Sequence, residues 1–202
     1  MSTAARLSHK SALVLLPPSN IQAPIETVRR VHDTHFARWP PHINLIYPLL
    51  ERPSVQSEGS SLPELKERIR SRIMEITRHI EPFHMSLLTD GPKSFIHSKN
   101  SRTVWLQPSS DLVSSLQAAL QTQFAECDHD QRPFVPHLSL GQAKTDAQQT
   151  QLCGMLNKGV TDRIIESETK ELPWLVDSVY VIERKGFKDR FKIVGAIKLR
   201  EA

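Results

Sequence analysis

The sequence predicts one α+β domain made of two related halves around a central cleft. Segments with strand and helix patterns interleave along the 202 residues. A short motif, a histidine that follows a proline and opens a strand, occurs at corresponding places in both halves. The two histidines, His42 and His137, are 95 residues apart, which leaves room for a half-domain between them.

The first half begins with residues 1–8, which are polar and are expected to form a flexible N-terminal tail before a single domain, 9–202. Residues 11–16 predict a buried strand that ends at Pro17-Pro18. The apolar spacing then predicts a helix from Pro24 to about residue 36, and a motif strand at 43–47.

The middle of the chain begins with an exposed loop at 52–60, rich in Ser and Pro. A capping box at 61–64 then predicts a helix to about residue 79. Strands are expected at 83–88, 94–97 and 103–107, with a turn at 90–92, and a helix follows from about residue 109.

The remainder starts with a charged loop at 127–132 and the second motif strand. Thr145 and Gln148 predict the start of a helix that ends near residue 158. Two β-type runs, 175–183 and 191–199, predict a closing antiparallel hairpin.

The composition is ordinary for a globular protein, with 39% apolar and 24% charged residues. The net charge of +4 suits a polyanionic substrate or RNA, but an ordinary basic protein fits it equally well. Cys127 and Cys153 form no paired motif, which indicates free thiols in a reducing compartment. No apolar run reaches membrane length, so we expect no membrane partner and a cytoplasmic or nuclear protein.

The two motifs carry the chemistry. Pro41-His42-Ile43-Asn44 and Pro136-His137-Leu138-Ser139 each place a titratable ring and a hydrogen-bonding side chain on one strand face. Two imidazoles with pKa values near 6.5 can act as an acid and a base together. Asn44 and Ser139 can donate hydrogen bonds to phosphate oxygens, so this chemistry needs no metal.

This arrangement resembles the 2H (two-histidine) phosphoesterase superfamily, which includes 2′-5′ RNA ligase-like proteins and 2′,3′-cyclic nucleotide phosphodiesterases. The second copy fits the family motif His-x-Thr/Ser-x fully, whereas Asn44 replaces the hydroxyl residue of the first. The Arg38-Trp39 and Phe134-Val135-Pro136 lead-ins and the terminal hairpin are also similar. The resemblance implies two antiparallel sheets flanked by helices and related by a pseudo-two-fold axis.

The resemblance also implies His42 and His137 as the catalytic pair, and Ser139, with Asn44, as phosphate ligands. The expected activity is a metal-independent phosphodiesterase that opens 2′,3′-cyclic phosphates of nucleotides or RNA ends to 2′-phosphates. We expect no cofactor, a nucleotide or RNA-end substrate, and a monomer. Candidate substrate-binding residues are Arg38, Trp39, Tyr47 and Phe134, although a packed aromatic is the favoured interpretation of each ring.

Two alternatives stay open. Asn44 motivates a catalytically weak RNA-binding or adaptor module, and the same chemistry could act on ADP-ribose cyclic phosphate or 2′-5′ oligonucleotides. Strict alternation places Gln142 and Tyr47 on the strand face away from the site. Asp128-His129-Asp130 could bind a cation, but a solvated loop is the favoured interpretation.

Overall fold

The computed structural model describes residues 6–56, 63–128, 132–161 and 171–200. No helix in these ranges combines the length and the apolar character needed to cross a membrane. The elements in chain order are β1 Leu7–Ser8, β2 Ser11–Leu15, α1 Ser19–His32, β3 Ile43–Ile46, β4 Leu49–Leu50, β5 Ser54–Gln56, β6 Pro63–Leu65, α2 Glu67–Thr77, β7 Phe83–Ser98, β8 Ser101–Pro108, α3 Leu112–Gln123, a 3-10 turn Ala125–Cys127, β9 Leu138–Ala143, α4 Asp146–Thr161, β10 Glu171–Val176, β11 Ser178–Glu183 and β12 Lys192–Lys198.

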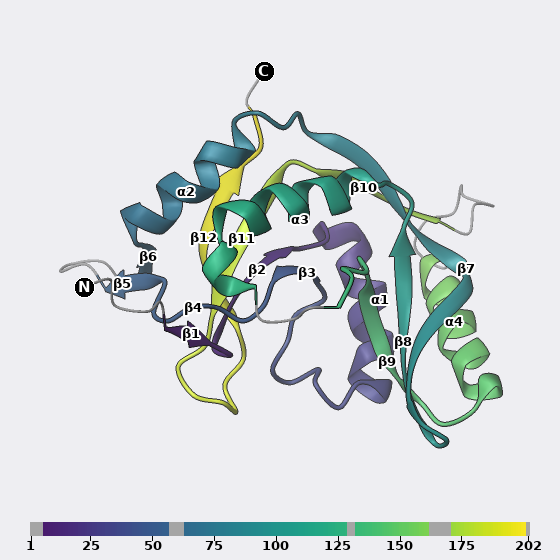
Figure 1. Cartoon of the computed structure of the whole chain (residues 1–202). Helices are drawn as coiled ribbons and strands as arrows, with labels where there is room; N and C mark the ends of the chain where they lie inside the picture. Colours follow the sequence, from purple (N-terminus) through teal and green to yellow (C-terminus); the bar gives the residue numbers. More distant parts are fainter. Residues whose placement is uncertain (1–5, 57–62, 129–131, 162–170, 201–202) are drawn as a thin grey trace.

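The main sheet has the strand order β10-β7-β8-β9-β3-β2-β11-β12, and every pairing in it is antiparallel. It consists of two four-stranded halves that meet at β9 and β3 through one residue pair, Ile43 opposite Leu138. Both side chains are fully buried. The predicted α+β fold with two antiparallel sheets flanked by helices is confirmed (Figure 1).

A strand–helix–strand unit occurs once in each half. In the first half β2, α1 and β3 follow one another, and in the second half β8, α3 and β9 do so. The motif strand is the innermost strand on each side of the junction. Both motif strands also carry a β-bulge at the same motif position, Leu45 in β3 and Leu140 in β9. The predicted relation between the two halves therefore extends to the irregularities of their strands.

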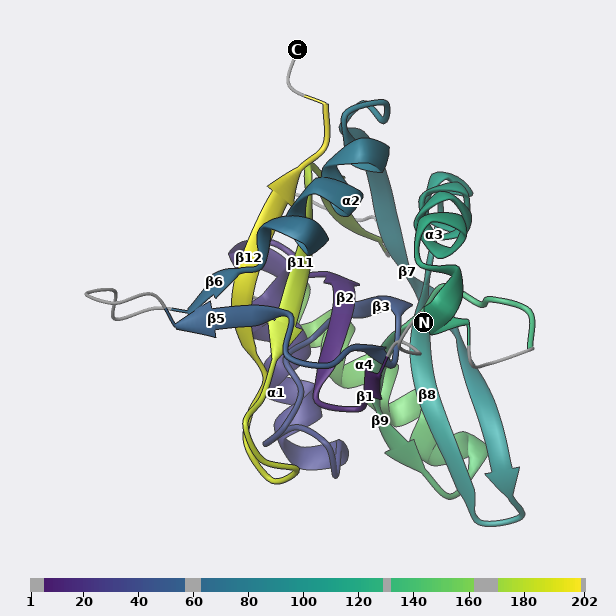
Figure 2. The ribbon, with the colours of Figure 1, turned by 60° about the vertical axis from the view of Figure 1, so that its left-hand side comes forward.

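The helix of each strand–helix–strand unit packs on the other half of the sheet. Helix α1 packs on α4 and on β9, and α3 packs on α2 and on β3. Each unit's helix thus covers the motif strand of the other unit, with α1 and α4 on the right, α2 at the upper left and α3 across the upper middle of Figure 1. Figure 2 shows the same two helix pairs on either side of the junction.

The face of the first half opposite the main core carries a second, small apolar cluster. Ala12, Val14, Ile182 and Phe191 form its buried part, and Trp39 and Tyr47 pack against it. Because Val14 pairs with Asn44, the side chain of Asn44 projects on this same face. The second cluster therefore lies beside the first motif.

Two predicted helix starts were wrong. Helix α1 begins at Ser19 directly after Pro18, and Pro24 lies inside it, in its second turn. Residues 63–65 form strand β6, which pairs with β5, so helix α2 begins only at Glu67. Pro63 is the first residue of its strand, where a missing N–H is tolerated. Residues 57–62 lie outside the described residues, so the first part of the predicted capping box does too.

Two predicted boundaries also differ. Leu7 and Ser8, placed in the tail from the sequence, pair with Leu50 and Leu49, so the structured chain begins before residue 9. The run 175–183 is split at Asp177 between β10, an edge strand in one half of the sheet, and β11, which lies between β2 and β12 in the other half. A β-type pattern does not show where a chain changes its pairing partner. The predicted hairpin itself is confirmed as β11 and β12.

The close approach of α1 to β9 depends on Gly141. Its φ is 153°, and a Cβ atom placed there would lie 2.6 Å from the carbonyl oxygen of His32 at the end of α1. That oxygen is backbone and cannot rotate away, so any side chain here must push the helix from the strand. Gly141 therefore sets the spacing between the end of α1 and the second motif strand.

We expect Gly141→Ala to lower the free energy of unfolding by about 1–3 kcal/mol, because overpacking shifts backbone at this contact. Urea unfolding measures the change. Gly154→Ala in α4 is the matched control, since a Cβ there meets nothing within 4 Å. The control should gain roughly 0.5–1 kcal/mol from better helix propensity. Equal stability of the Gly141 variant and the wild type would contradict this account.

Candidate active site

The single pair at the sheet junction brings the two motifs together. His42 and His137 directly precede the paired residues Ile43 and Leu138. Extending this antiparallel ladder by one residue places His42 opposite Ser139, and Asn44 opposite His137. Since Ile43 and Leu138 point into the core, the four polar side chains project on the other face of the sheet.

Both histidines are oriented in the same way. Nδ1 of His42 bonds to the carbonyl oxygen of Pro40 at 2.7 Å, and Nδ1 of His137 bonds to that of Val135 at 2.7 Å. A carbonyl oxygen only accepts, so each Nδ1 carries the hydrogen. Each Nε2 is therefore the atom that can take or give a proton. In the sequence, one proline separates each motif histidine from the residue whose carbonyl oxygen accepts the hydrogen bond of its ring.

Burial lowers the pKa of both rings. The pKa of His42 is lowered to about 4, chiefly by burial and to a smaller extent by the positive charges of Arg29 and His137. The hydrogen bond to Pro40 and the Asp33 carboxylate oppose this lowering. Burial also lowers the pKa of His137, against the effect of its bond to Val135. A charge on His137 thus lowers the pKa of His42.

Aromatic side chains hold the two imidazoles. The ring of Trp39 stacks on His42 with centroids 4.6 Å apart and planes at 14°. Trp39 in turn contacts Tyr47 at 5.2 Å and Phe191 at 4.0 Å. Trp39 and Tyr47, both predicted site residues, therefore lie beside the first motif.

The second histidine has a similar setting, which the sequence analysis missed. Phe95 meets the ring of His137 edge-on at 4.9 Å, and Trp105 lies 5.7 Å from it. Trp105 pairs with Ser139 across β8 and β9, so it projects on the site face. Only the strand register relates Trp105 and Phe95 to the motif, and no motif spacing could have found them.

The bulges correct the strand faces predicted for Tyr47 and Gln142. A bulge inserts one extra residue and reverses the alternation beyond it. After Leu45, Tyr47 turns to the face of the first motif, where it packs on Trp39. After Leu140, Gln142 pairs with Thr103, two positions from Trp105 on the same strand. Gly141 inside a strand pattern was the available signal for the second bulge.

The other predicted residues have different environments. The Oδ1 atom of Asn44 is buried and has no hydrogen-bond partner within the described ranges. Ser139 is half-buried beside it in the site. The guanidinium of Arg38 is hydrogen-bonded to Nδ1 of His35. Phe134 packs against the main core, so the structure does not bring it to the site face.

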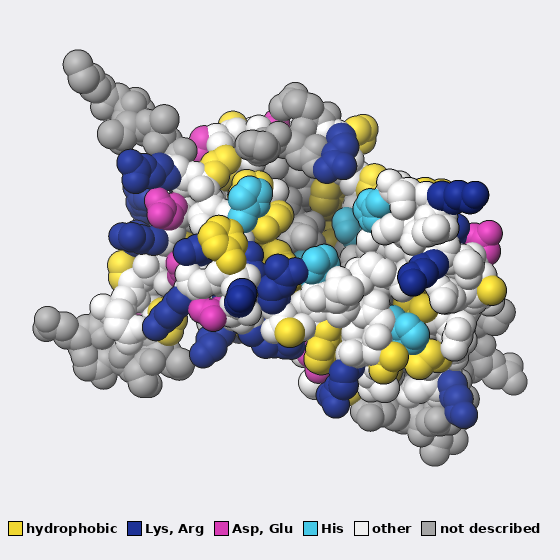
Figure 3. Space-filling view, turned by 90° about the horizontal axis from the view of Figure 1, so that it is seen from below, with side chains coloured by type: hydrophobic (Ala, Val, Ile, Leu, Met, Phe, Trp, Pro, Cys, Tyr) yellow, Lys and Arg dark blue, Asp and Glu magenta, His cyan; other side chains and the backbone are white. Residues whose placement is uncertain are grey.

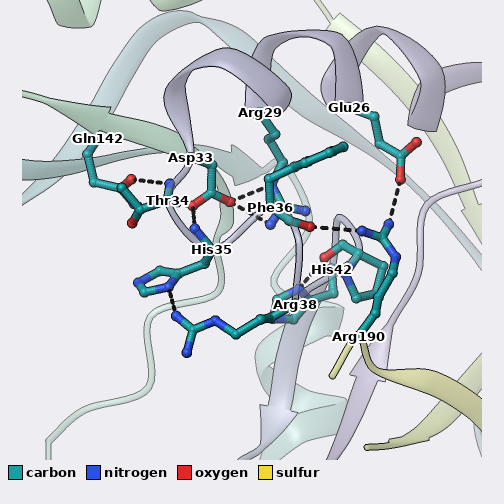
Figure 4. A network of polar contacts seen from close by, with 11 residues as sticks. Glu26, Arg29, Asp33, Thr34, His35, Phe36, Arg38, His42, Gln142 and Arg190 are labelled. Carbon is teal, nitrogen blue, oxygen red and sulfur yellow. Dashed lines mark hydrogen bonds and ion pairs between the residues drawn. The ribbon is translucent and has the colours of Figure 1, made fainter. Parts of the chain in front are cut away.

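A buried polar network links the end of α1 to the segment that leads into the first motif (Figure 4). The guanidinium of Arg29 donates to Oδ2 of Asp33 at 2.6 and 2.9 Å, and both side chains are 2% exposed. Oδ1 of Asp33 accepts from the backbone N–H of His35 and from Nε2 of Gln142. The Oε1 atom of Gln142 accepts from the N–H of Thr34 at 2.9 Å. Gln142 therefore ties the second motif strand to the segment that leads into the first motif.

The residues that the structure describes do not form a metal-binding site. No group of three or more His, Cys, Asp or Glu side chains there could hold a metal ion. His129 and Asp130, which the sequence analysis considered as cation ligands, lie outside the described residues.

Comparisons with known proteins identify related families and folds. A model of the 2′-5′ RNA ligase superfamily matches residues 17–187. A candidate phosphoesterase of Bacillus cereus strain B4264 is 27% identical over 150 residues, which cover 73% of this chain and 77% of the relative. One of Oceanobacillus iheyensis is 24% identical over 133 residues, which cover 66% and 70%.

Solved structures share the fold. The complex of E. coli LigT with 3′-AMP superimposes with a TM-score of 0.54 at 16% identity, covering 97% of this chain and 100% of that chain. The protein TT0787 of Thermus thermophilus gives a TM-score of 0.52 at 16% identity, covering 94% and 97%.

We expect Asp33→Asn to lower the free energy of unfolding by about 3–5 kcal/mol, because the buried charge of Arg29 loses its partner. Urea unfolding measures the loss. Glu26→Gln removes the same charge from the exposed pair with Arg190, whose side chains are 25% and 40% exposed. That control should change stability by less than about 1 kcal/mol. Similar losses in both variants would show that the Arg29–Asp33 pair has no special role.

We expect the His42 imidazole to titrate with a midpoint near 4 in the native protein. Unfolded histidine titrates at about 6.5. Between these values the unfolded state binds the extra proton, so the free energy of unfolding falls as the pH falls through this window. NMR titration, with the His42 signal identified from a His42→Gln variant, gives the midpoint. A midpoint at or above about 6, close to that of unfolded histidine, would refute the assigned environment.

Proposed function

The chain belongs to the 2′-5′ RNA ligase superfamily of two-histidine phosphoesterases, and we propose that it opens 2′,3′-cyclic phosphates of nucleotides or RNA ends to 2′-phosphates. One observation carries this proposal. His42 and His137 come from two strands that touch through one residue pair, and each is held by Nδ1 with Nε2 left for proton transfer. One chain supplies both rings, which supports a monomeric enzyme.

In the proposed reaction, water attacks the phosphorus atom of the cyclic phosphate. Nε2 of one histidine takes the proton of the water, and the bond from phosphorus to the 3′ oxygen breaks. Nε2 of the other histidine gives its proton to the 3′ oxygen, and the product keeps a 2′-phosphate. After the reaction the first histidine is protonated and the second is neutral. Proton exchange with solvent restores the starting state of both rings. Both proton transfers are supplied by side chains, so the proposed mechanism needs no metal.

We assign the base to His42 and the acid to His137. Burial, and to a smaller extent the positive charge of Arg29, disfavours the protonated form of His42. His42 is therefore neutral and ready to accept a proton. The proton that the pair holds goes to His137, and the negative phosphate of a bound substrate stabilises that charge.

Asn44 and Ser139 lie opposite the two histidines and are the proposed phosphate ligands. The side-chain NH₂ of Asn44 and the hydroxyl of Ser139 are the groups that can donate hydrogen bonds to a phosphate. Oriented donors of this kind stabilise charge as it grows on the non-bridging oxygens. The 3′-AMP in the crystals of E. coli LigT supports a nucleotide in this family's site.

We expect the wild type to hydrolyse nucleoside 2′,3′-cyclic monophosphates to 2′-monophosphates in the presence of EDTA. His42→Ala and His137→Ala should each lower kcat by roughly 10²–10⁴, the usual contribution of a general acid or base. Chromatography of the products identifies the phosphate position. His84→Ala, an exposed histidine on β7, is the matched control and should retain full activity.

A second substrate tests which histidine is the base and which is the acid. A nucleoside 2′-(4-nitrophenyl phosphate) replaces the 3′ oxygen by a leaving group that needs no proton. His137→Ala should lose far less activity on this substrate than His42→Ala. The opposite pattern would exchange the two roles. Retained cyclic-phosphate activity in both alanine variants would refute the proposal, and a wild type without turnover on any cyclic phosphate would favour an RNA-binding module.

A further inference from the structure

The loop between β11 and β12, together with the first residue of β12, has a formal charge equal to the net charge of the whole chain. Residues 184–192 hold five basic side chains and one acidic one, a formal charge of +4. The chain as a whole has 26 basic and 22 acidic residues, so the remainder holds 21 of each and is neutral. The basic residues are Arg184, Lys185, Lys188, Arg190 and Lys192, and the acidic one is Asp189.

Internal hydrogen bonds give this loop a fixed shape. Arg184 is buried, and its guanidinium donates to the carbonyl oxygens of Phe187 at 2.5 Å and of His9 at 3.1 Å. The N–H of Gly186 donates to the Asp189 carboxylate at 2.7 Å. The one acidic side chain is thus used to close the turn.

The loop is also docked on the segment that leads into the first motif. The N–H of Phe191 donates to the carbonyl oxygen of Arg38 at 2.8 Å, next to Trp39. The guanidinium of Arg190 donates to the carbonyl oxygen of Phe36 at 2.8 Å and pairs with Glu26. The position of the loop relative to the site is therefore set by direct contacts.

A row of rings and cations connects His42 to the tip of the loop. Trp39 stacks on His42, and Phe191 lies 4.0 Å from Trp39. The guanidinium of Arg184 lies over Phe191 at 4.7 Å and over Phe187 at 5.4 Å. Phe187 is 62% exposed, which is unusual for so large an apolar ring.

Free cations flank that exposed ring. Lys185 and Lys188 are exposed, and within the described ranges neither forms an ion pair or a hydrogen bond. The ammonium of Lys10 lies 5.0 Å from the Phe187 ring centre. Figure 3, which looks from the lower side of Figure 1 where the loop lies, shows Lys and Arg side chains around hydrophobic ones beside a hollow bordered by histidines.

We propose that Lys10, Lys185, Phe187 and Lys188, here called the loop surface, bind the strand of a single-stranded RNA whose 3′ end lies between the two histidines. Cations that track phosphates and exposed rings that stack on bases are how proteins hold single strands without reading sequence. This inference rests on the proposed function and narrows it. The preferred substrates are oligonucleotide ends, not mononucleotides.

The alternative of an anionic membrane surface fits less well. A lipid contact requires only the exposed tip, and it gives no reason for the row of rings to end at His42. A strand that leaves the site along this row meets a ring and then the free cations in turn. The observations therefore favour a nucleic acid strand.

The test compares two substrates that end in the same nucleoside 2′,3′-cyclic phosphate, one a mononucleotide and one a short RNA. The wild type should have the higher kcat/KM on the RNA. Lys185→Ala/Lys188→Ala and Phe187→Ser should lose this advantage and keep the mononucleotide activity. Loss of the ring should weaken RNA use roughly fivefold or more, because base–aromatic stacks contribute at that level.

A matched charge control and a salt series sharpen the result. Arg68→Ala/Lys158→Ala removes the same charge from exposed positions on α2 and α4 and should leave RNA use unchanged. The salt dependence of RNA binding, measured by fluorescence anisotropy, should become shallower in the double lysine variant. The slope should fall by about 1.4, since each phosphate contact on a single strand contributes about 0.7.

Equal kcat/KM on the two substrates in the wild type would overturn the inference, as would equal losses in the loop and control variants. Binding of phosphatidylserine vesicles by the loop surface without any preference for RNA would assign it to membranes instead. These failures differ from a failure of the proposed function, in which the wild type turns over neither substrate. In that case the anisotropy arm still tests RNA binding by the loop surface.

Discussion

One residue pair, Ile43 opposite Leu138, joins the two halves of the sheet, and the geometry of the site depends on it. Each histidine stands one residue before a member of this pair. The register of a single contact therefore fixes which side chains of the two motifs face one another. A slip by one residue would turn the polar side chains of one motif into the core, at a large desolvation cost. The crossed packing of α1 on β9 and of α3 on β3 holds this contact from both sides.

The buried Arg29–Asp33 pair is the second constraint on the site. Removing two charges from water is unfavourable, and such pairs are weak sources of stability. Here the pair has an electrostatic effect on His42, whose pKa Arg29 lowers and Asp33 raises. It also anchors the backbone of His35, and Gln142 extends the contact to the second motif strand. The polar network thus links the position of the first histidine to the strand that carries the second.

Patterns within one segment could be predicted from the sequence, and patterns that depend on pairing could not. The cap of α4 by Thr145 and the terminal hairpin are local features, and the structure bears them out. The faces of Tyr47 and Gln142 depend on bulges, which are properties of two strands together. Phe95 and Trp105 enter the site only through the register of β7, β8 and β9. The strand at 63–65 forms because β5 pairs with it, although its residues resemble a helix start.

The split at Asp177 has a consequence for the order in which the sheet can form during synthesis. Strand β10 completes one edge of the sheet and β12 the other, and both come from the last part of the chain. Until that part leaves the ribosome, β7 and β2 each lack a neighbour and expose unpaired backbone groups. Since synthesis adds residues from the N-terminus onward, both halves stay open at one edge for most of this time. Strands β3 and β9 lie at the centre of the sheet and are made earlier, so the two histidines can meet while both edges are still open.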